Sequence, residues 1–290
     1  YLMSLLVTGS SGFIGSNLAD YLSSKKIKFF GLDKVDNKYI KIKNFYKTNL
    51  TNKSKLEKIF KKNKFKYIIH LAALPGFVSC HNYPDKAFND NIIATFNLIE
   101  LAKKYGTKKI LIASSMGVDN FTESPSIYGF TKFFCEQLSH TYVKTKNMNI
   151  TICKISNVFG PYSLHKSSVV HSFIKNILNK KPLKIHKNGL QERDFIYSLD
   201  VCKIFVNNIF KLSKKKEIKI NTRRFLRVMD IKKLLDSISM KKNKLNFITT
   251  PSGYDDKVYN KPIIKANKSF INNLKKTFNW YNDTCKKIGI

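Results

Sequence analysis

Polar side chains near the middle of the chain have the spacing of a proton-transfer site. Tyr128 precedes Lys132 by four residues, which places the phenol and the ammonium group on one face of a helix. We expect the ammonium group to favour the phenolate and to lower the pKa of Tyr128. Ser114 and Ser115 end an apolar run, at the strand edge where open α/β sheets bind ligands. The set predicts a general base acting on a sugar or alcohol hydroxyl, with a serine hydroxyl bonded to the same oxygen.

A glycine-rich turn near the N-terminus predicts a nucleotide site. Gly9, Gly12 and Gly15 lie in the segment TGSSGFIG, directly after an expected strand and at the start of an expected helix. Glycines allow a tight turn and close approach of a pyrophosphate to the helix N-terminus. The alternative is a purely structural turn, but Asp33 follows Gly12 by about 20 residues, as expected for a carboxylate on the adenine ribose. NAD is therefore favoured over NADP, and Lys34 weakens that preference.

These residues need a scaffold, and the first half of the chain predicts one. Short apolar runs alternate with segments of helical periodicity, which is typical of βαβ units and of a doubly wound, Rossmann-type parallel sheet. Expected strands are 5–7, 27–32, 67–71, 109–113 and 150–155, and expected helices include 13–22 and 96–102.

The pattern changes after Pro161, where lysine-rich helices are expected near 169–179 and 231–238. We predict a smaller mixed α/β lobe there. The NAD-binding domain would comprise 1–161 with about 195–222, and the substrate lobe about 162–194 with 223–290.

The charge of the chain is strongly positive but does not predict a specific nucleic-acid partner. Lys and Arg total 53 against 19 Asp and Glu, a net charge of +34. Only four of the basic residues are arginine, the usual reader of phosphates and bases. The lysines are spread along the whole chain, so we interpret the excess as compositional, with a field that attracts small anionic substrates.

Cysteine usage and hydropathy predict a cytoplasmic protein. The five cysteines are scattered and contain no CxxC pair, which argues against a disulfide framework and against a metal site. No apolar run approaches the length of a membrane span, and the first residues lack the pattern of a signal peptide. No membrane partner is expected.

Several motifs, in order along nearly the whole chain, resemble the extended short-chain dehydrogenase/reductase family and its nucleotide-sugar epimerase/dehydratase branch. Besides TGSSGFIG and the Ser/Tyr/Lys set, the chain carries segments similar to HLAA, NxxGTxNLLE, NVYGP and QxRDFxYVxDV. In this sequence they are His70–Ala73, Asn91–Glu100, Asn157–Pro161 and Gln191–Val201.

The resemblance implies a role for each matching residue. Tyr128 would be the base, Lys132 would hold the nicotinamide ribose, and Ser115 would bind the reacting sugar oxygen. Residues implied in cofactor binding are Gly9, Gly12, Phe13, Ile14, Gly15, Asp33, Lys34, Asn49, Leu50, Leu71, Ala72, Ala73, Asn91, Ser114, Tyr128, Lys132 and Ile155. Residues implied in substrate binding are Ser115, Asn157, Lys166, Ser168, Val169 and Arg193. A local salt bridge with Glu192 or Asp194 is the structural alternative for Arg193.

The resemblance also implies a reaction. The family's 4,6-dehydratases carry an Asp-Glu pair after the catalytic hydroxyl residue, whereas Met116 and Gly117 stand there in this chain. Epimerisation at C4 of a nucleoside-diphosphate sugar, by the NAD-dependent route of UDP-glucose 4-epimerases, is therefore expected. A 4-keto reductase and a catalytically idle NAD-binding protein remain alternatives. A homodimer and a place in polysaccharide biosynthesis are expected by resemblance.

Three departures from the family pattern accompany this expectation. The segment between Ser115 and Tyr128 is short, Asn49 replaces an aspartate near the adenine, and an RPGD-like segment has only Thr250–Asp255 as its counterpart.

Overall fold

The computed structural model describes residues 4–120, 125–212, 215–249 and 266–287. The chain forms two compact units. The first comprises Tyr1–Ile155 with Val201–Ile220, and the second comprises Ser156–Asp200 with Asn221–Ile290.

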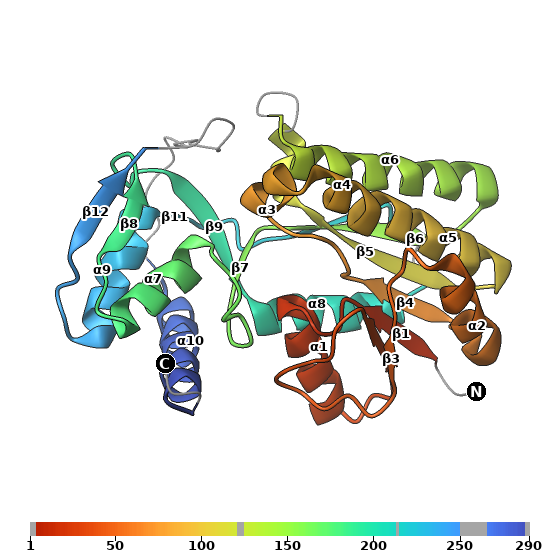
Figure 1. The fold of residues 1–290 in the computed structure, drawn as a ribbon, viewed down its shortest axis with the longest axis horizontal. Coiled ribbons are helices and arrows are strands. Elements are labelled where there is room, and N and C mark those ends of the chain that lie inside the picture. The colour runs from red at the N-terminus through yellow and green to blue at the C-terminus, as the bar shows by residue number, and fades with distance from the viewer. Residues whose placement is uncertain (1–3, 121–124, 213–214, 250–265, 288–290) are drawn as a thin grey trace. The chain divides into compact units, whose positions relative to one another are not determined.

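A seven-stranded sheet forms the centre of the first unit (Figure 1). Its order is β10-β6-β5-β4-β1-β2-β3, and every neighbouring pair is parallel. Its strands are β1 (Leu5–Thr8), β2 (Phe30–Asp33), β3 (Phe45–Lys47), β4 (Tyr67–His70), β5 (Lys109–Ser115), β6 (Ile150–Ile155) and β10 (Glu217–Ile220). β1 is buried along its whole length, as expected for a strand covered on both faces. The predicted doubly wound α/β fold is confirmed.

Helices cover both faces of this sheet. α2, α5 and α6 pack side by side, and α1 lies on the opposite face (Figure 1). The helical segments are α1 (Phe13–Ser24), α2 (Lys53–Asn63), α3 (Phe77–Asn82), α4 (Pro84–Ala87), the π-helical η1 (Phe88–Ile93), α5 (Ala94–Lys104), the 3-10 turn η2 (Met116–Asn120), α6 (Ile127–Lys146) and α8 (Ser198–Ile209). Ser126 caps α6, because its hydroxyl accepts the Gly129 N–H at 3.0 Å, and so fixes the helix start one residue before Tyr128.

Two predicted strand boundaries are wrong for identifiable reasons. The second strand begins at Phe30 rather than at Ile27, because the Ile27 N–H donates to the Leu22 carbonyl and continues the end of α1. The fifth strand extends to Ser115 rather than ending at 113, because its pairing with β6 continues to Ser115 opposite Ile155. Ser114 and Ser115 are therefore strand residues.

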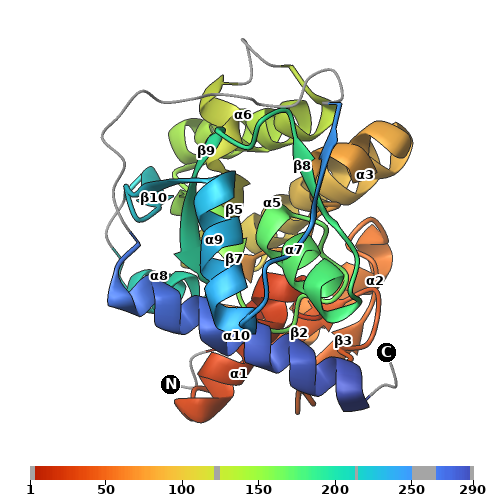
Figure 2. The same cartoon turned by 90° about the vertical axis from the view of Figure 1, so that its left-hand side faces the viewer.

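The second unit is a smaller mixed α/β structure. It contains a three-stranded sheet of β7 (Asn157–Phe159), β9 (Glu192–Tyr197) and β11 (Phe225–Arg227), and a two-stranded sheet of β8 (Leu183–His186) and β12 (Leu245–Ile248). Helices α7 (Val169–Leu178), α9 (Val228–Ser239) and α10 (Lys268–Lys287) pack on one another, with α10 running across the ends of the other two (Figure 2). Phe173, Leu235 and Tyr281 are fully buried in the core they share.

All five cysteines are free thiols, and four of them are buried. Within the described ranges, no helix combines the length and the apolar character needed to cross a membrane.

Candidate active site

The glycine-rich turn of the first unit has the close packing that excludes side chains. Gly9 has φ +70°, and a Cβ there would lie 2.5 Å from the Ala72 backbone nitrogen. A Cβ on Gly15 would lie 2.0 Å from the Gly9 carbonyl oxygen. A Cβ on Gly12 would meet only that same oxygen, at 3.3 Å, so the start of α1 is open above Gly12. An open helix N-terminus without acids in its first turn fits a bound pyrophosphate.

Substitution of Gly15 provides a direct test of this turn. We expect Gly15→Ala to displace the Gly9–Gly12 backbone, because the new methyl group and the Gly9 carbonyl cannot both keep their places. The dissociation constant of Gly15→Ala protein for NAD should rise at least about tenfold, which corresponds to about 1.4 kcal/mol of misplaced contacts, so the purified variant should carry less NAD than wild type. Cofactor content after heat release measures this. Ser23→Ala, an exposed change at the other end of α1, should retain wild-type content.

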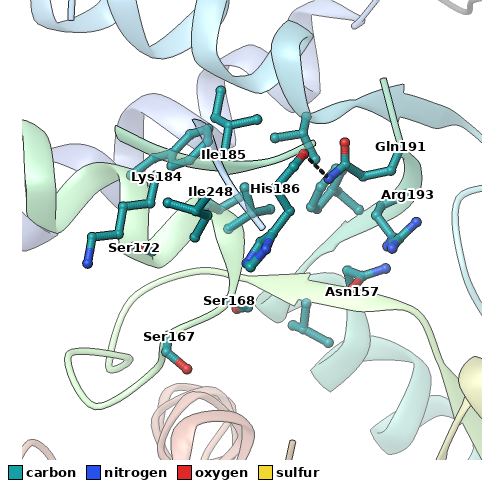
Figure 3. Close-up of a pocket in the computed structure, with 16 residues that line it drawn as sticks. Asn157, Ser167, Ser168, Ser172, Lys184, Ile185, His186, Gln191, Arg193 and Ile248 are labelled. Carbon is teal, nitrogen blue, oxygen red and sulfur yellow. Dashed lines mark hydrogen bonds between the residues drawn. The ribbon is translucent and has the colours of Figure 1, made fainter. Parts of the chain in front are cut away.

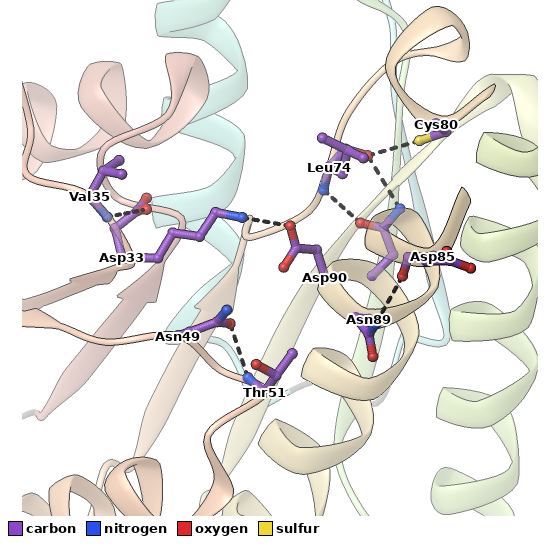
Figure 4. Close-up of polar contacts among 11 residues, drawn as sticks. Asp33, Val35, Asn49, Thr51, Leu74, Cys80, Asp85, Asn89 and Asp90 are labelled. Carbon is purple, nitrogen blue, oxygen red and sulfur yellow. Dashed lines mark hydrogen bonds and ion pairs between the residues drawn. The ribbon is translucent and has the colours of Figure 1, made fainter. Parts of the chain in front are cut away.

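Asp33, the predicted ribose partner, ends β2 beside the glycine turn. Its carboxylate accepts the Ser11 N–H at 3.0 Å and the Val35 N–H at 3.3 Å, which ties the end of β2 to the glycine turn. Burial raises the pKa of Asp33, against the lowering effect of these N–H groups. Figure 4 shows Asp33 together with Asn49, whose side chain accepts the Thr51 N–H at 3.1 Å. The neighbouring Leu50 is buried, and its carbonyl accepts from Asn97 at 3.0 Å.

The HLAA-like segment approaches the same turn through its backbone. Leu71 donates its N–H to the Thr8 carbonyl at 3.1 Å, and Ala72 is the residue that leaves no room for a Cβ on Gly9. Ala73 follows directly. Ile155, at the end of β6, pairs with both Ser115 and Ile220. The structure thus places these predicted cofactor residues at the carboxyl edge of the sheet, where ligands of such folds bind.

A buried chain of hydrogen bonds joins the glycine turn to α6. The imidazole of His70 contacts the Thr8 hydroxyl at 2.6 Å and the Thr95 hydroxyl at 2.9 Å, and Thr95 donates to the Asn91 carbonyl at 2.5 Å. Asn91 donates from its side chain to the Thr131 hydroxyl at 2.9 Å. Burial lowers the pKa of His70 to about 3, so the imidazole is neutral near pH 7.

Asn91 also holds the loop that follows β4. Its side-chain oxygen accepts the Leu74 N–H at 2.6 Å, and its amide nitrogen donates to the Leu74 carbonyl at 3.2 Å (Figure 4). Both ends of the amide are therefore engaged by protein groups. Any contribution of Asn91 to a cofactor site is exerted through the position of this loop.

Ser115, Tyr128 and Lys132 lie together in the first unit. The Ser115 side chain is near enough to the Tyr128 phenol to lower its pKa. The Ser115 oxygen also accepts the Gly117 N–H at 3.1 Å, and Lys132 donates to the Ala113 carbonyl at 3.0 Å. Tyr128 and Lys132 are on one helix, α6, four residues apart as predicted. The arrangement places a phenol and two hydrogen-bonding groups at the edge where β5 ends.

The predicted direction of the Tyr128 pKa is wrong for the chain alone. Burial raises the pKa of Tyr128 to about 12, and the nearby Cys80 thiol group raises it as well, whereas the Ser115 side chain lowers it. Lys132 is itself partly buried, which lowers the pKa of its ammonium group. Loss of hydration is thus the largest cause of the shift in the Tyr128 pKa. The positive charge of an oxidised nicotinamide would act in the opposite direction, towards phenolate.

An ionic network centred on the buried Lys154 and Glu136, which sequence reasoning missed, lies beside Ser114. The Ser114 hydroxyl donates to Glu136 at 2.5 Å, and Glu136 faces the Lys154 ammonium group at 3.4 Å. Lys154 also pairs with Asp119 at 2.5 Å and with Glu217 at 3.2 Å. The network therefore joins β5, η2, α6, β6 and β10. Glu136 follows Lys132 by four residues, about one helical turn. This spacing could have indicated from the sequence that both side chains lie on one face of the helix.

The second unit contains a pocket of about 230 Å³. This volume is below the roughly 300–1,000 Å³ of pockets that enclose a drug-sized ligand, so it suits one part of a larger molecule. His186 lies at its centre, with Arg193 and Asn157 together at one side and Lys184 at the other (Figure 3). Of the predicted substrate residues, the lining includes Asn157, Ser168, Val169 and Arg193.

Hydrogen bonds hold the polar lining of this pocket. The Arg193 guanidinium donates to the Glu192 carbonyl at 2.8 Å, and Asn157 donates to the Asp194 carbonyl at 3.2 Å. The side-chain carboxylate of Asp194 has a different partner: it accepts a hydrogen bond from the Thr222 hydroxyl at 2.9 Å. The Ser168 hydroxyl contacts His171 at 2.7 Å.

Lys166 does not line the pocket, and burial lowers the pKa of its ammonium group. The segment Thr250–Asp255 lies outside the described residues.

Several lining residues were not predicted. Lys184 and His186 come from β8, where Leu183 and Ile185 are the buried positions, and Gln191 donates to the His186 carbonyl at 3.1 Å. The alternation of Leu, Lys, Ile and His in β8 places Lys184 and His186 on one face of the strand. That pattern was a readable signal, but nothing in it specifies a pocket.

Comparison with known proteins agrees with this geometry. A profile of the NAD dependent epimerase/dehydratase family matches residues 5–221. The chain belongs to this family. The family resemblance inferred from the motifs is thereby confirmed, and NAD is the cofactor of the family.

Three relatives illustrate the range of the epimerase/dehydratase family around this member. A UDP-glucuronate 4-epimerase of Thermodesulfobacterium geofontis is 30% identical, over 98% of this chain and 97% of that protein. A dTDP-D-glucose 4,6-dehydratase of Dictyostelium discoideum is 30% identical, over 71% of this chain and 55% of that protein. The UDP-glucose 4-epimerase of Thermotoga maritima, solved with UDP-glucose, superposes with a TM-score of 0.86 at 26% identity, covering 97% of this chain and 99% of the other.

Proposed function

We propose that the protein is an NAD-dependent epimerase that inverts C4 of a nucleoside-diphosphate sugar, and that the nucleotide is uridine diphosphate. The observation that carries the proposal is the placement of Ser115 at the end of β5, at the carboxyl edge of a Rossmann-type sheet, beside the helix α6 that carries Tyr128 and Lys132. The similarity to UDP-sugar 4-epimerases over almost the full length supports it. Met116 and Gly117, which follow Ser115, supply no acid or base for dehydration.

The chain's own residues account for the proton steps. Tyr128 takes the proton of the sugar 4-hydroxyl and returns it after the 4-keto sugar has presented its other face. Ser115 donates a hydrogen bond to the same oxygen, and Lys132 favours the phenolate and binds the nicotinamide ribose. Bound NAD supplies a reversible hydride acceptor. Gly9, Gly12 and Gly15 with Asp33 would hold its pyrophosphate and adenine ribose.

The pocket of the second unit has the chemistry of a nucleotide site. Arg193 offers a planar fork of donors for a diphosphate, and Asn157 offers an amide. The imidazole of His186 provides a flat surface for a base, and Ser168 and Val169 also line the pocket. Lys166 would act from outside the pocket as a point charge.

The proposal is tested with purified protein and no added cofactor. The substrates are UDP-glucose, UDP-galactose, and their N-acetyl and uronic-acid forms, with proton NMR of C1 and C4 as the readout. Interconversion of one C4 pair is expected and identifies the sugar. Consumption of NADH on a keto sugar would indicate a reductase instead, and the absence of any conversion would indicate an idle NAD-binding protein.

We further propose a cytoplasmic homodimer. α5 and α6 pack together and expose phenylalanine rings to solvent: Phe96 on α5, and Phe130, Phe133 and Phe134 on α6, which are 38–46% exposed. Burial of these rings against a second copy would remove apolar surface from water. A monomeric mass in analytical ultracentrifugation would contradict the dimer.

A further inference from the structure

Two lysines flank the carboxylate expected to bind the adenine ribose. Lys34 follows Asp33 in the chain, and Lys47 is the register partner of Asp33 on β3. The adjacent Thr48 donates its N–H to the Asp33 carbonyl at 2.8 Å, which fixes this register. A cation beside the ribose is what favours a 2′-phosphate, the group that distinguishes NADP from NAD. By position, both lysines are suited to bind it.

Each of these lysines is held by an aspartate. Lys34 lies 2.6 Å from Asp90 of η1, whose side chain is 12% exposed (Figure 4). Lys47 lies 2.5 Å from Asp36, in the loop after β2. Each of the two ammonium groups is therefore paired with a carboxylate other than that of Asp33.

The composition of the chain makes this pairing informative. Carboxylates are scarce, with 19 against 53 basic residues, and the loop that joins β2 to β3 carries the further lysines Lys38, Lys41 and Lys43. A field of this sign attracts the more highly charged NADP. Selectivity for NAD in such surroundings requires that nearby positive charges be neutralised. Asp33 can accept hydrogen bonds from the ribose, but it does not neutralise both Lys34 and Lys47.

We propose that Asp90 and Asp36 are specificity-determining residues for the cofactor. By holding Lys34 and Lys47, they withdraw the cations that would otherwise bind a 2′-phosphate, and their own charges repel it. This inference rests on the proposed function, because it assumes that the adenine ribose lies at Asp33. It assigns discrimination to three aspartates rather than to Asp33 alone.

Binding to cofactor-free protein tests the inference without reference to turnover. The variants are Asp90→Asn, Asp36→Asn and the double variant, with dissociation constants for NADH and NADPH taken from nicotinamide fluorescence at low ionic strength. The affinity for NADPH relative to NADH should rise about tenfold in the double variant, which corresponds to about 1.4 kcal/mol. The rise should diminish at high salt, because exposed charges are screened. Asp36→Asn, at an exposed position, should give part of the effect without disturbing the fold.

Two further variants separate a local effect from the general field. Glu57→Gln removes the same charge from the Lys104–Glu57 pair of α2 and α5, and should leave the NADPH-to-NADH ratio within about twofold of wild type. Lys34→Met added to Asp90→Asn should restore the wild-type ratio. An unchanged ratio in the double variant, or an equal rise in Glu57→Gln, would overturn the inference while leaving NADH binding and the proposed function intact. Failure of wild-type protein to bind NADH would overturn both.

Discussion

Tyr128→Phe should lower the rate of C4 inversion by about 10²- to 10⁴-fold, the range that a positioned general base contributes. The substitution keeps the aromatic ring on α6 and removes only the phenol hydroxyl. Binding of NAD and of the nucleotide sugar should persist, because the glycine turn and the second-unit pocket contain no atom of Tyr128. The NMR assay on purified variant protein measures the rate.

A matched variant on the same helix controls for loss of a phenol. Tyr142→Phe removes a hydroxyl that donates to Glu100 at 2.6 Å, further along α6. We expect its rate to stay within about threefold of wild type, as for a change outside the reacting groups. Equal losses in the two variants would show that Tyr128 acts through the helix and not as the base.

The state of the Tyr128 proton can be followed directly. Its pKa is raised to about 12 in the chain alone, mainly by burial, so the phenol is protonated at neutral pH. Bound oxidised cofactor should shift the titration towards neutrality, because a cation favours phenolate. The difference in ultraviolet tyrosinate absorbance between wild type and Tyr128→Phe, with and without NAD, reports that shift.

Lys154→Met should lower the free energy of unfolding by about 3–5 kcal/mol, as expected when one member of a buried ionic network is removed. The Lys154 side chain is 11% exposed and that of Glu136 is 5% exposed. Burial would lower the pKa of Lys154, yet Asp119, Glu136 and Glu217 together raise it, which shows how strongly the ammonium group is held. Denaturant unfolding measures the loss.

Two comparisons distinguish the loss of compensation from a simple loss of packing. Glu136→Gln added to Lys154→Met should recover part of the stability, because Gln keeps an acceptor for Ser114 and removes the uncompensated carboxylate. Lys104→Met breaks an exposed pair with Glu57 and should leave the denaturation midpoint nearly unchanged. A double variant as unstable as the single one would contradict the ionic explanation.

Local sequence patterns were sufficient to predict those segments in which a function would require particular residue types. The glycine turn, Asp33 and the Tyr128–Lys132 spacing each require particular residue types, so they were readable in one sequence. The parallel sheet followed from apolar runs alternating with helical periodicity. The strand starting at Phe30 was placed too early because Ile27 is apolar but its N–H bonds to Leu22 of α1, and apolar character alone does not mark a hydrogen-bonding partner.

The remaining parts of the site depend on long-range contacts. Lys154 and Asp119 are far apart in sequence, and only the sheet brings them to Glu136. The Tyr128 pKa depends on how many atoms exclude water from the phenol, which spacing along a helix does not give. His186 lies on β8, which pairs with β12, so its position depends on a contact between segments that are distant in the sequence.

The chain of hydrogen bonds from Thr8 through His70, Thr95 and Asn91 to Thr131 limits how far the glycine turn can move relative to α6. Its members belong to β1, β4, α5, η1 and α6, so displacement of the glycine turn relative to the catalytic helix must break a buried bond, at about 1–3 kcal/mol each. The proposed cofactor site and the helix that carries Tyr128 are therefore positioned relative to each other when the protein folds. With these elements preorganised, we expect the ligands to move during each catalytic cycle while the linked elements of the first unit keep their positions.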